Sequence, residues 1–303
     1  MLPVSCFGKL PFHREFLRIG LGGAGASWVV RWVEGAHESW NRAGNVPDGS
    51  PLVRFAAAVD GGAVVAGVVR QSTDGLRRHP VAFFVEDKRG ADTDEWHLLP
   101  LAFEGPWAAL GELGERSWES LASLTAALDS GVPEPDWERA RPGYHEALAA
   151  PSGGAPWEAL VGVHGEPARH VAANLLAVLA AQHDARSEAE GVSVAVPLPD
   201  DPTAAPGRAC LWLELLGAAA ARPAVVVGSA PSRLVAFFRP PEGSDLAAVL
   251  SSLDMAPIDD LGEPWQSLPP EGSDRAAAID RLVTPTTGSL GSVREHLGSA
   301  VTA

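Results

Sequence analysis

Three short apolar runs in the first ninety residues constrain the fold more than any other feature. They span Leu52 to Val59, Ala63 to Val69 and Val81 to Val85. The first two are separated by Asp60-Gly61-Gly62, and glycine accepts the positive φ angles that a tight hairpin requires. Runs of this length with turn signals between them predict an antiparallel β-meander.

Helices are predicted on either side of this meander. Trp28, Trp32 and Trp40 recur at multiples of four residues, and Ser27 is available as an N-cap. Because an aromatic stripe at helical spacing is usually core, we interpret the tryptophans as packing residues. After Asp94, apolar residues again recur at helical spacing, and prolines interrupt them, which predicts several short helices.

The second half of the chain predicts a smaller α/β part. Residues 131–156 are rich in Pro, Gly and Ala, which indicates either a domain boundary or a long irregular connection near the end of a first module. We therefore expect an N-terminal domain at 1–130 and a C-terminal α/β region at 131–283. Residues 284–303 are rich in Ser, Thr and Gly and predict a flexible tail. The fold class is α/β of the α+β type.

Composition narrows the range of partners and compartments. The formal net charge is -15, and a surface of that sign repels the nucleic-acid backbone and anionic membranes. A basic protein partner and plain solubility both remain compatible with this charge. The two cysteines form no disulfide framework, and no apolar run approaches the length that spans a bilayer. We expect a cytoplasmic protein without membrane insertion.

A series of short motifs runs through the first eighty residues. In order, these are Phe7-Gly8-Lys9-Leu10-Pro11, Phe16-Leu17-Arg18, Trp28 and Trp32, Gly67-Val68-Val69, Ser72-Thr73-Asp74, Arg77-Arg78 and Pro80. This order resembles the TagF (ImpM) family, whose members are associated with bacterial type VI secretion. The family has Gly-Asp where this chain has Arg14-Glu15, and the segment before Pro80 is one residue shorter here.

The resemblance implies both a fold and a function. It implies an N-terminal longin-like or profilin-like domain, in which helices flank an antiparallel sheet. It also implies a post-translational negative regulator of type VI secretion. Such a regulator is no enzyme, requires no cofactor, and binds a scaffold protein that carries a forkhead-associated domain.

Two segments are candidates for binding. Lys9, Leu10, Pro11, Phe12 and Arg14 follow the first strand and are a candidate recognition loop. Alternatively, Pro11 shapes a turn while Leu10 and Phe12 fill the core.

The second segment is a polar loop between two strands. It contains Ser72, Asp74, Arg77, Arg78 and His79, and paired guanidinium groups suit a carboxylate or phosphate. Alternatively, Asp74 forms an Asx turn and the arginines are solvated.

Catalytic motifs are missing from the sequence. It contains no HExxH, no Gly-x-Ser-x-Gly and no GxxxxGK[ST], so we predict neither catalysis nor a metal site. The rival hypothesis is a small α/β hydrolase or phospho-ligand enzyme that uses Ser72, Asp74 and Arg77. A longin-like adaptor in another pathway is a further alternative.

Overall fold

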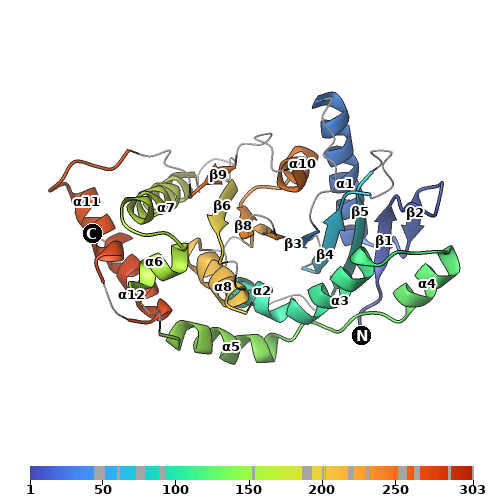
Figure 1. Cartoon of the computed structure of the whole chain (residues 1–303), viewed down its shortest axis with the longest axis horizontal. Coiled ribbons are helices and arrows are strands. Elements are labelled where there is room, and N and C mark those ends of the chain that lie inside the picture. The colour runs from blue at the N-terminus through green and yellow to red at the C-terminus, as the bar shows by residue number, and fades with distance from the viewer. Residues whose placement is uncertain are drawn as a thin grey trace.

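The computed structural model describes most of the chain. Described are residues 1–43, 52–59, 62–72, 79–88, 93–151, 154–185, 193–199, 201, 203–217, 222–229, 232–251, 258–262, 267–285 and 288–301. Within them, nine strands form one sheet in the order β2-β1-β5-β4-β3-β7-β8-β6-β9 (Figure 1). Neighbouring strands pair antiparallel, except that β6 and β9 are parallel. The mixed α/β class is therefore confirmed.

The strands have the following bounds: β1 Ser5–Gly8, β2 Leu17–Ile19, β3 Val53–Ala58, β4 Val64–Arg70, β5 Val81–Asp87, β6 Ser193–Pro197, β7 Ala224–Ser229, β8 Ser232–Phe237 and β9 Asp259–Asp260. The predicted meander is confirmed as β3, β4 and β5. At its first turn, Val59 donates a hydrogen bond to Ala63 O at 2.9 Å, and Gly62 adopts a φ of 78°. Only glycine adopts this backbone without strain.

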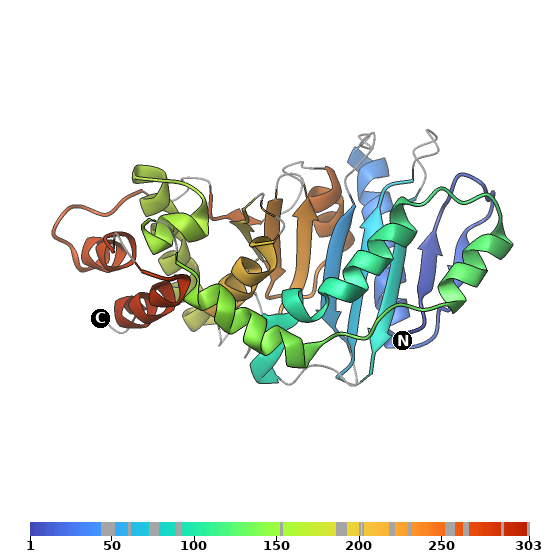
Figure 2. The same ribbon diagram turned by 60° about the horizontal axis from the view of Figure 1, so that its bottom comes forward.

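Helices cover both faces of the sheet (Figures 1 and 2). They are α1 Ala24–Ala43, α2 Leu99–Ala102, α3 Glu104–Glu115, α4 Leu121–Asp129, α5 Trp137–Ala149, α6 Pro156–Val161, α7 Glu166–Ala185, α8 Ala205–Leu215, α10 Gly243–Ser251, α11 Asp274–Val283 and α12 Leu290–Val301, with a 3-10 helix η1 at Thr93–Leu98. Consecutive strand residues face opposite layers: Phe84 belongs to the same hydrophobic cluster as Trp32 of α1, and Phe83 belongs to the other cluster, with Trp107 of α3. No helix in the described part of the chain is long and apolar enough to cross a bilayer.

Helix α1 begins earlier than the sequence predicts. Its first turn is capped from the sheet, because Glu86 of β5 accepts a hydrogen bond from Gly25 N at 3.2 Å. The Ser27 hydroxyl donates to Gly23 O at 3.2 Å, so Ser27 lies inside the helix. The N-cap prediction for Ser27 was wrong because a carboxylate distant in sequence satisfies this helix end.

The tryptophans of α1 are packing residues, as interpreted from their spacing. Trp32 and Trp40 are buried, and their indole N–H groups donate to Glu242 O at 2.9 Å and Ala247 O at 3.3 Å. Both acceptors lie at or within α10. These two bonds tie α1 to a helix that follows it by about two hundred residues.

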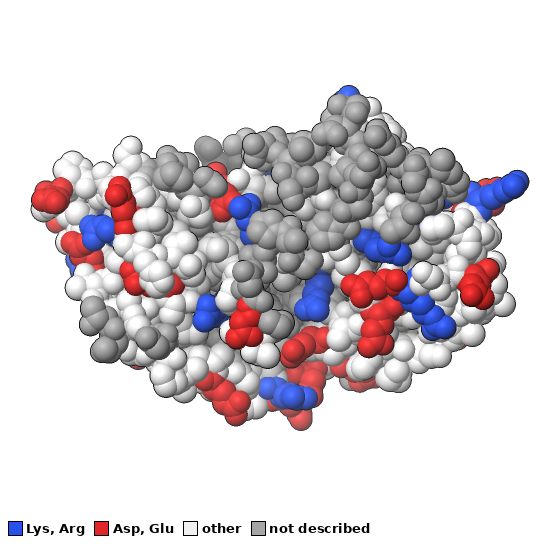
Figure 3. Space-filling model, in the orientation of Figure 1, with Lys and Arg blue, Asp and Glu red and all other residues white. Residues whose placement is uncertain are grey.

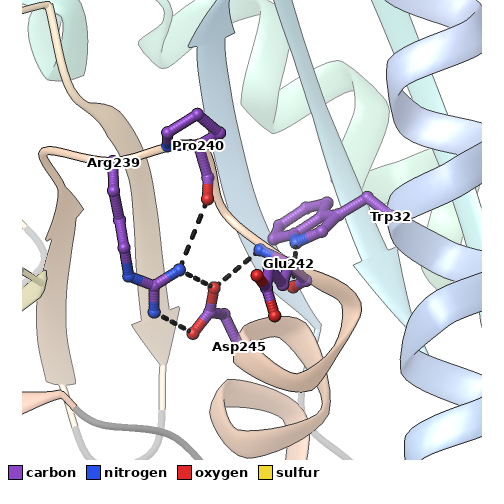
Figure 4. A network of polar contacts seen from close by, with 5 residues as sticks. All are labelled: Trp32, Arg239, Pro240, Glu242 and Asp245. Carbon is purple, nitrogen blue, oxygen red and sulfur yellow. Dashed lines mark hydrogen bonds and ion pairs between the residues drawn. The ribbon is translucent and has the colours of Figure 1, made fainter. Parts of the chain in front are cut away.

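A buried ion pair fixes the start of α10 (Figure 4). Asp245 has no solvent exposure and accepts from Arg239 Nη1 at 2.7 Å and Nη2 at 2.6 Å. It also accepts from Glu242 N at 2.7 Å. Arg239 donates in addition to Pro240 O at 3.3 Å. The pair thus joins the end of β8 to the helix that Trp32 contacts.

The chain before residue 130 and the chain after 131 share one sheet. β3 pairs with β7, with Phe55 opposite Val226.

Helix α5 lies where a long irregular connection was predicted, so that prediction was wrong. Its start is capped by Asp136, which accepts from Arg139 N at 2.9 Å, and Tyr144 anchors it to the core. Proline and glycine content masked this local N-cap signal.

The expectation of a flexible tail at 284–303 was wrong for residues 290–301, which form α12. Leu290, Val293 and Leu297 are at most 7% exposed and belong to the larger hydrophobic cluster. They recur at three- and four-residue steps, the spacing of one helical face. Small residues between them lowered the average hydrophobicity and concealed this face.

Candidate functional site

Strand pairing brings the loop after β1 beside the residues that directly precede β5. Gly8 at the end of β1 lies opposite Val81 at the start of β5, and the loop at 9–16 returns as β2 beside β1. The rings of Phe16 and His79 meet edge to face, with centroids 4.5 Å apart. The segment 9–16 and the segment 79–80 therefore meet at one end of the sheet, although they are far apart in the sequence. We call the residues 9–16 and 79–80 the loop site.

A tight turn shapes the loop site. His13 N donates to Leu10 O at 3.1 Å, which places Pro11 at the second position of a four-residue turn. Proline favours that position because its ring presets φ. Leu10 is 2% exposed, and Phe12 packs partly buried against the larger cluster. The alternative in which Pro11 turns the chain and Leu10 fills the core is confirmed, so Leu10 presents no surface to a partner.

Lys9 makes two contacts across the loop. Its ammonium donates to Arg14 O at 2.6 Å and lies 4.8 Å from the centroid of the Phe16 ring. The Phe16 ring in turn stacks on Phe7 of β1 at 5.8 Å. The Lys9 charge is thus turned inward across the loop, while Pro11 and Arg14 are exposed.

The polar loop is only partly described. Ser72 is 7% exposed, and its hydroxyl is buried without a hydrogen-bond partner among the described residues. Ser72 is therefore not displayed at the surface as the sequence analysis expected, because it lies just beyond β4 against the sheet. Asp74, Arg77 and Arg78 lie outside the described residues.

His79 of the loop site, which the sequence places in the polar loop, pairs with His37, which the sequence analysis did not single out. His37 of α1 stacks on His79 with centroids 3.6 Å apart. The Nδ1 atoms of both rings are buried and have no hydrogen-bond partner in the described part of the chain. Only the position of α1 over the start of β5 brings these rings together, so the sequence carries no spacing signal for them.

Burial keeps this pair uncharged near neutral pH. It lowers the pKa of His79 to about 4, with smaller contributions from the positive charge that His37 carries when protonated and from Lys9. Burial also lowers the pKa of His37, which the nearby Glu38 partly opposes. Two neutral rings stack without charge repulsion, whereas two protonated rings at this distance repel.

Acidification is expected to destabilise the fold through His79. Its pKa is about 4 in the folded chain against 6.5 normally. Between these values the unfolded chain binds the proton that the folded chain does not, so stability is lost as the pH falls from 6.5 to 4. Because the ring is half-buried and screened, we expect a loss on the order of 1–2 kcal/mol.

Urea denaturation at neutral pH and near pH 4.5 measures this loss. His79→Phe is expected to reduce the pH dependence relative to the unmodified protein. His145→Phe, which changes an exposed histidine on α5, is the control and should leave it unchanged. An undiminished pH dependence in His79→Phe would contradict the assignment.

Acidic and basic side chains lie next to one another at the end of the molecule that carries the loop site. Arg14, Glu15 and Arg18 are exposed, and Arg18 pairs with Glu34 at 3.3 Å. Figure 3 shows basic and acidic side chains projecting side by side at the right-hand end of the view, where β1 and β2 lie. In the described part of the chain, no three His, Cys, Asp or Glu side chains gather as metal ligands.

Comparison with known proteins assigns no family. No family model matches the chain, and no curated protein matches it. It is similar to a solved structure, PA0076 from Pseudomonas aeruginosa PAO1, with 23% identity and a TM-score of 0.36. The match covers 44% of this chain and 64% of PA0076. A likeness at this level carries no argument about family or activity.

Proposed function

We propose that this chain is a non-enzymatic, negative regulator of bacterial type VI secretion that acts in the cytoplasm by binding another protein. The sequence support is the ordered series of TagF-like motifs. The structural observation that carries the proposal is the contact between Phe16 and His79, at 4.5 Å. Through it, the loop after β1 and the residues directly before β5 lie side by side in the loop site.

The chemistry of the loop site suits protein recognition. Arginine and aromatic side chains contribute most to protein–protein binding energy, and the site presents exposed Arg14 beside partly buried Phe12 and Phe16. The bond from Lys9 to Arg14 O orders the loop before a partner arrives. Such preorganisation lowers the entropy lost on binding. The partner that the resemblance implies, a scaffold with a forkhead-associated domain, belongs to the same proposal.

The rival enzymatic function depends on a reactive Ser72. A nucleophilic hydroxyl requires a base within hydrogen-bond reach and an approach for substrate. The Ser72 hydroxyl is buried and has no hydrogen-bond partner among the described residues. This placement favours binding over hydrolysis for this end of the sheet.

Arg14→Glu is expected to weaken partner capture about tenfold or more, because reversing an exposed interface arginine removes a favourable contact and adds repulsion. The measurement is recovery of type VI components with the tagged protein, together with effector export, in a strain that carries a type VI cluster. Arg42→Glu reverses an exposed charge on α1 outside the loop site and is the matched control. Recovery of no secretion component, with export unchanged on deletion of the gene, would overturn the proposal.

A further inference from the structure

A pocket lies within the helical layer, away from the loop site. Its volume is about 270 Å³, and residues of α2, α5, α6, α8 and α12 line it. In Figures 1 and 2, α5, α6 and α12 lie toward the end of the molecule opposite β1 and β2. The volume is just below the range of roughly 300–1,000 Å³ that holds drug-sized ligands. The pocket therefore suits a small organic molecule.

Small residues on α5 keep this space open. Gly143, Ala147 and Ala150 line the pocket at steps of four and three residues, the spacing of one helical face. Gly207 of α8 lies against this face, because a Cβ added to it would be 2.6 Å from Ala147 Cβ. A Cβ added to Gly143 would meet only Leu101 Cδ1 among the described residues, at 4.0 Å. The two helices thus touch at Gly207 and leave room at Gly143.

A guanidinium group lines the same pocket. Arg208 of α8 is the one charged residue among the described residues of the lining. It is half-buried, forms no ion pair with a described residue, and has a buried Nε without a hydrogen-bond partner among them. Burial lowers the pKa of Arg208, which the charge of Asp201 partly opposes. A buried donor without an acceptor is costly, so water or a ligand normally satisfies it.

Asp201 leaves the guanidinium of Arg208 available. Its carboxylate accepts from Thr203 N at 2.9 Å and from Thr203 Oγ1 at 2.7 Å, in the turn before α8. Asp201 is exposed, so solvent screens its charge. Ala204, at the N-cap of α8, makes no side-chain hydrogen bond, and a helix start favours negative charge. One negative charge is therefore favoured beside Arg208, whereas Asp201 repels a dianion more strongly.

We propose that this pocket binds a small aliphatic monocarboxylate, of the short-chain fatty-acid class. The carboxylate pairs with Arg208, since a guanidinium offers paired donors to its two oxygens. The alkyl chain lies against the small residues of α5, where Leu101, Ala159 and Leu290 supply further apolar lining. The inference is independent of the function proposed for the loop site.

Titration of the full chain with acetate, butyrate, hexanoate and octanoate, followed by ligand-observed NMR, tests the proposal. The primary amides of the same chains are the neutral analogues. We expect affinity to rise about threefold with each added methylene until the pocket is full. The best carboxylate should bind with a dissociation constant below about 1 mM. It should bind about tenfold more tightly than its amide, because only the carboxylate forms charge-assisted hydrogen bonds with Arg208.

Gly143→Leu is expected to weaken carboxylate binding about tenfold or more, because the added side chain fills the space that the alkyl chain needs. Leucine is also a better helix former than glycine, so the variant should unfold at no lower temperature than the unmodified protein. Gly111→Leu on α3 is the matched control. An added Cβ there meets no described atom within 4 Å, and Gly111 does not line the pocket.

Arg208→Gln is expected to weaken carboxylate binding about tenfold and to leave amide binding unchanged. Arg139→Gln removes an exposed arginine of α5 outside the pocket and should leave both affinities unchanged. Thermal unfolding of each variant verifies that it folds. The proposal is overturned if no carboxylate binds at about 1 mM, if the amides bind as tightly as the carboxylates, or if Gly143→Leu binds with unmodified affinity.

Discussion

Gly8→Ala is expected to destabilise the protein by about 3–5 kcal/mol, a large part of the stability of a typical domain. Gly8 has a φ of 132°, which side-chain-bearing residues rarely adopt. An added Cβ would lie 2.1 Å from Pro80 O and 2.7 Å from Val81 Cα. Both are backbone atoms, so β1 must move away from β5. Because that pairing builds the loop site, partner capture should be lost as well.

Gly62→Ala separates the two causes of this effect. Gly62 also has a positive φ, 78°, but among the described residues no atom lies within 4 Å of the position that an added Cβ would take. Gly62→Ala should therefore cost only the backbone strain of a positive φ in a residue with a Cβ, about 1–2 kcal/mol. Urea unfolding of both variants measures the two losses of stability. The losses are compared through the urea concentration at the unfolding midpoint, provided that the dependence of the unfolding free energy on urea concentration is unchanged. Equal losses in the two variants would show that close approach of β1 to β5 contributes nothing.

Asp245→Ala is expected to cost about 3–5 kcal/mol, because it leaves the partly buried Arg239 without its partner. Asp245 is fully buried, accepts from both terminal nitrogens of Arg239, and accepts from Glu242 N (Figure 4). Its loss removes three charge-assisted hydrogen bonds at once. Thermal and urea unfolding measure the change, and α10 is expected to loosen from α1.

An exposed ion pair provides the control for Asp245. Arg169 and Asp280 are 2.6 Å apart, and their side chains are 35% and 51% exposed. Asp280→Ala should cost no more than about 1 kcal/mol, because solvent screens an exposed pair. Replacing Arg239 and Asp245 together by leucine should restore part of the stability lost in Asp245→Ala, since no buried charge is left unpaired. If Asp245→Ala costs no more than Asp280→Ala, the buried pair does not anchor α10.

The glycine of the Gly8-Lys9-Leu10-Pro11 motif illustrates what a sequence pattern leaves open. The pattern predicts a strand that meets a turn, and β1 and the Pro11 turn confirm it. The pattern does not reveal that β5 passes within contact distance of Gly8. This close approach is the reason that the position requires glycine. That requirement depends on β5, whose first residue lies more than seventy positions later.

The sequence predicted only those parts of the candidate site that depend on local signals. Pro11 and the loop residues were found because proline and polar residues act locally on the backbone. The histidine pair was not found, since His37 and His79 are forty-two positions apart and meet only when α1 packs over β5. Arg208 was likewise missed, because the pocket that it lines combines residues of α2, α5, α6 and α8.

The sequence by itself determined the meander, the helical stripe of tryptophans and the mixed α/β class. Each follows from periodicity and turn residues within one short segment, which bury one face locally. Only the tertiary structure decided that β3 pairs with β7 and makes one sheet from both halves of the chain. It also decided that Asp245 meets Arg239 and that Arg208 lines one pocket with the small residues of α5. Such contacts depend on strand order and helix placement, which are set by the packing of the whole core.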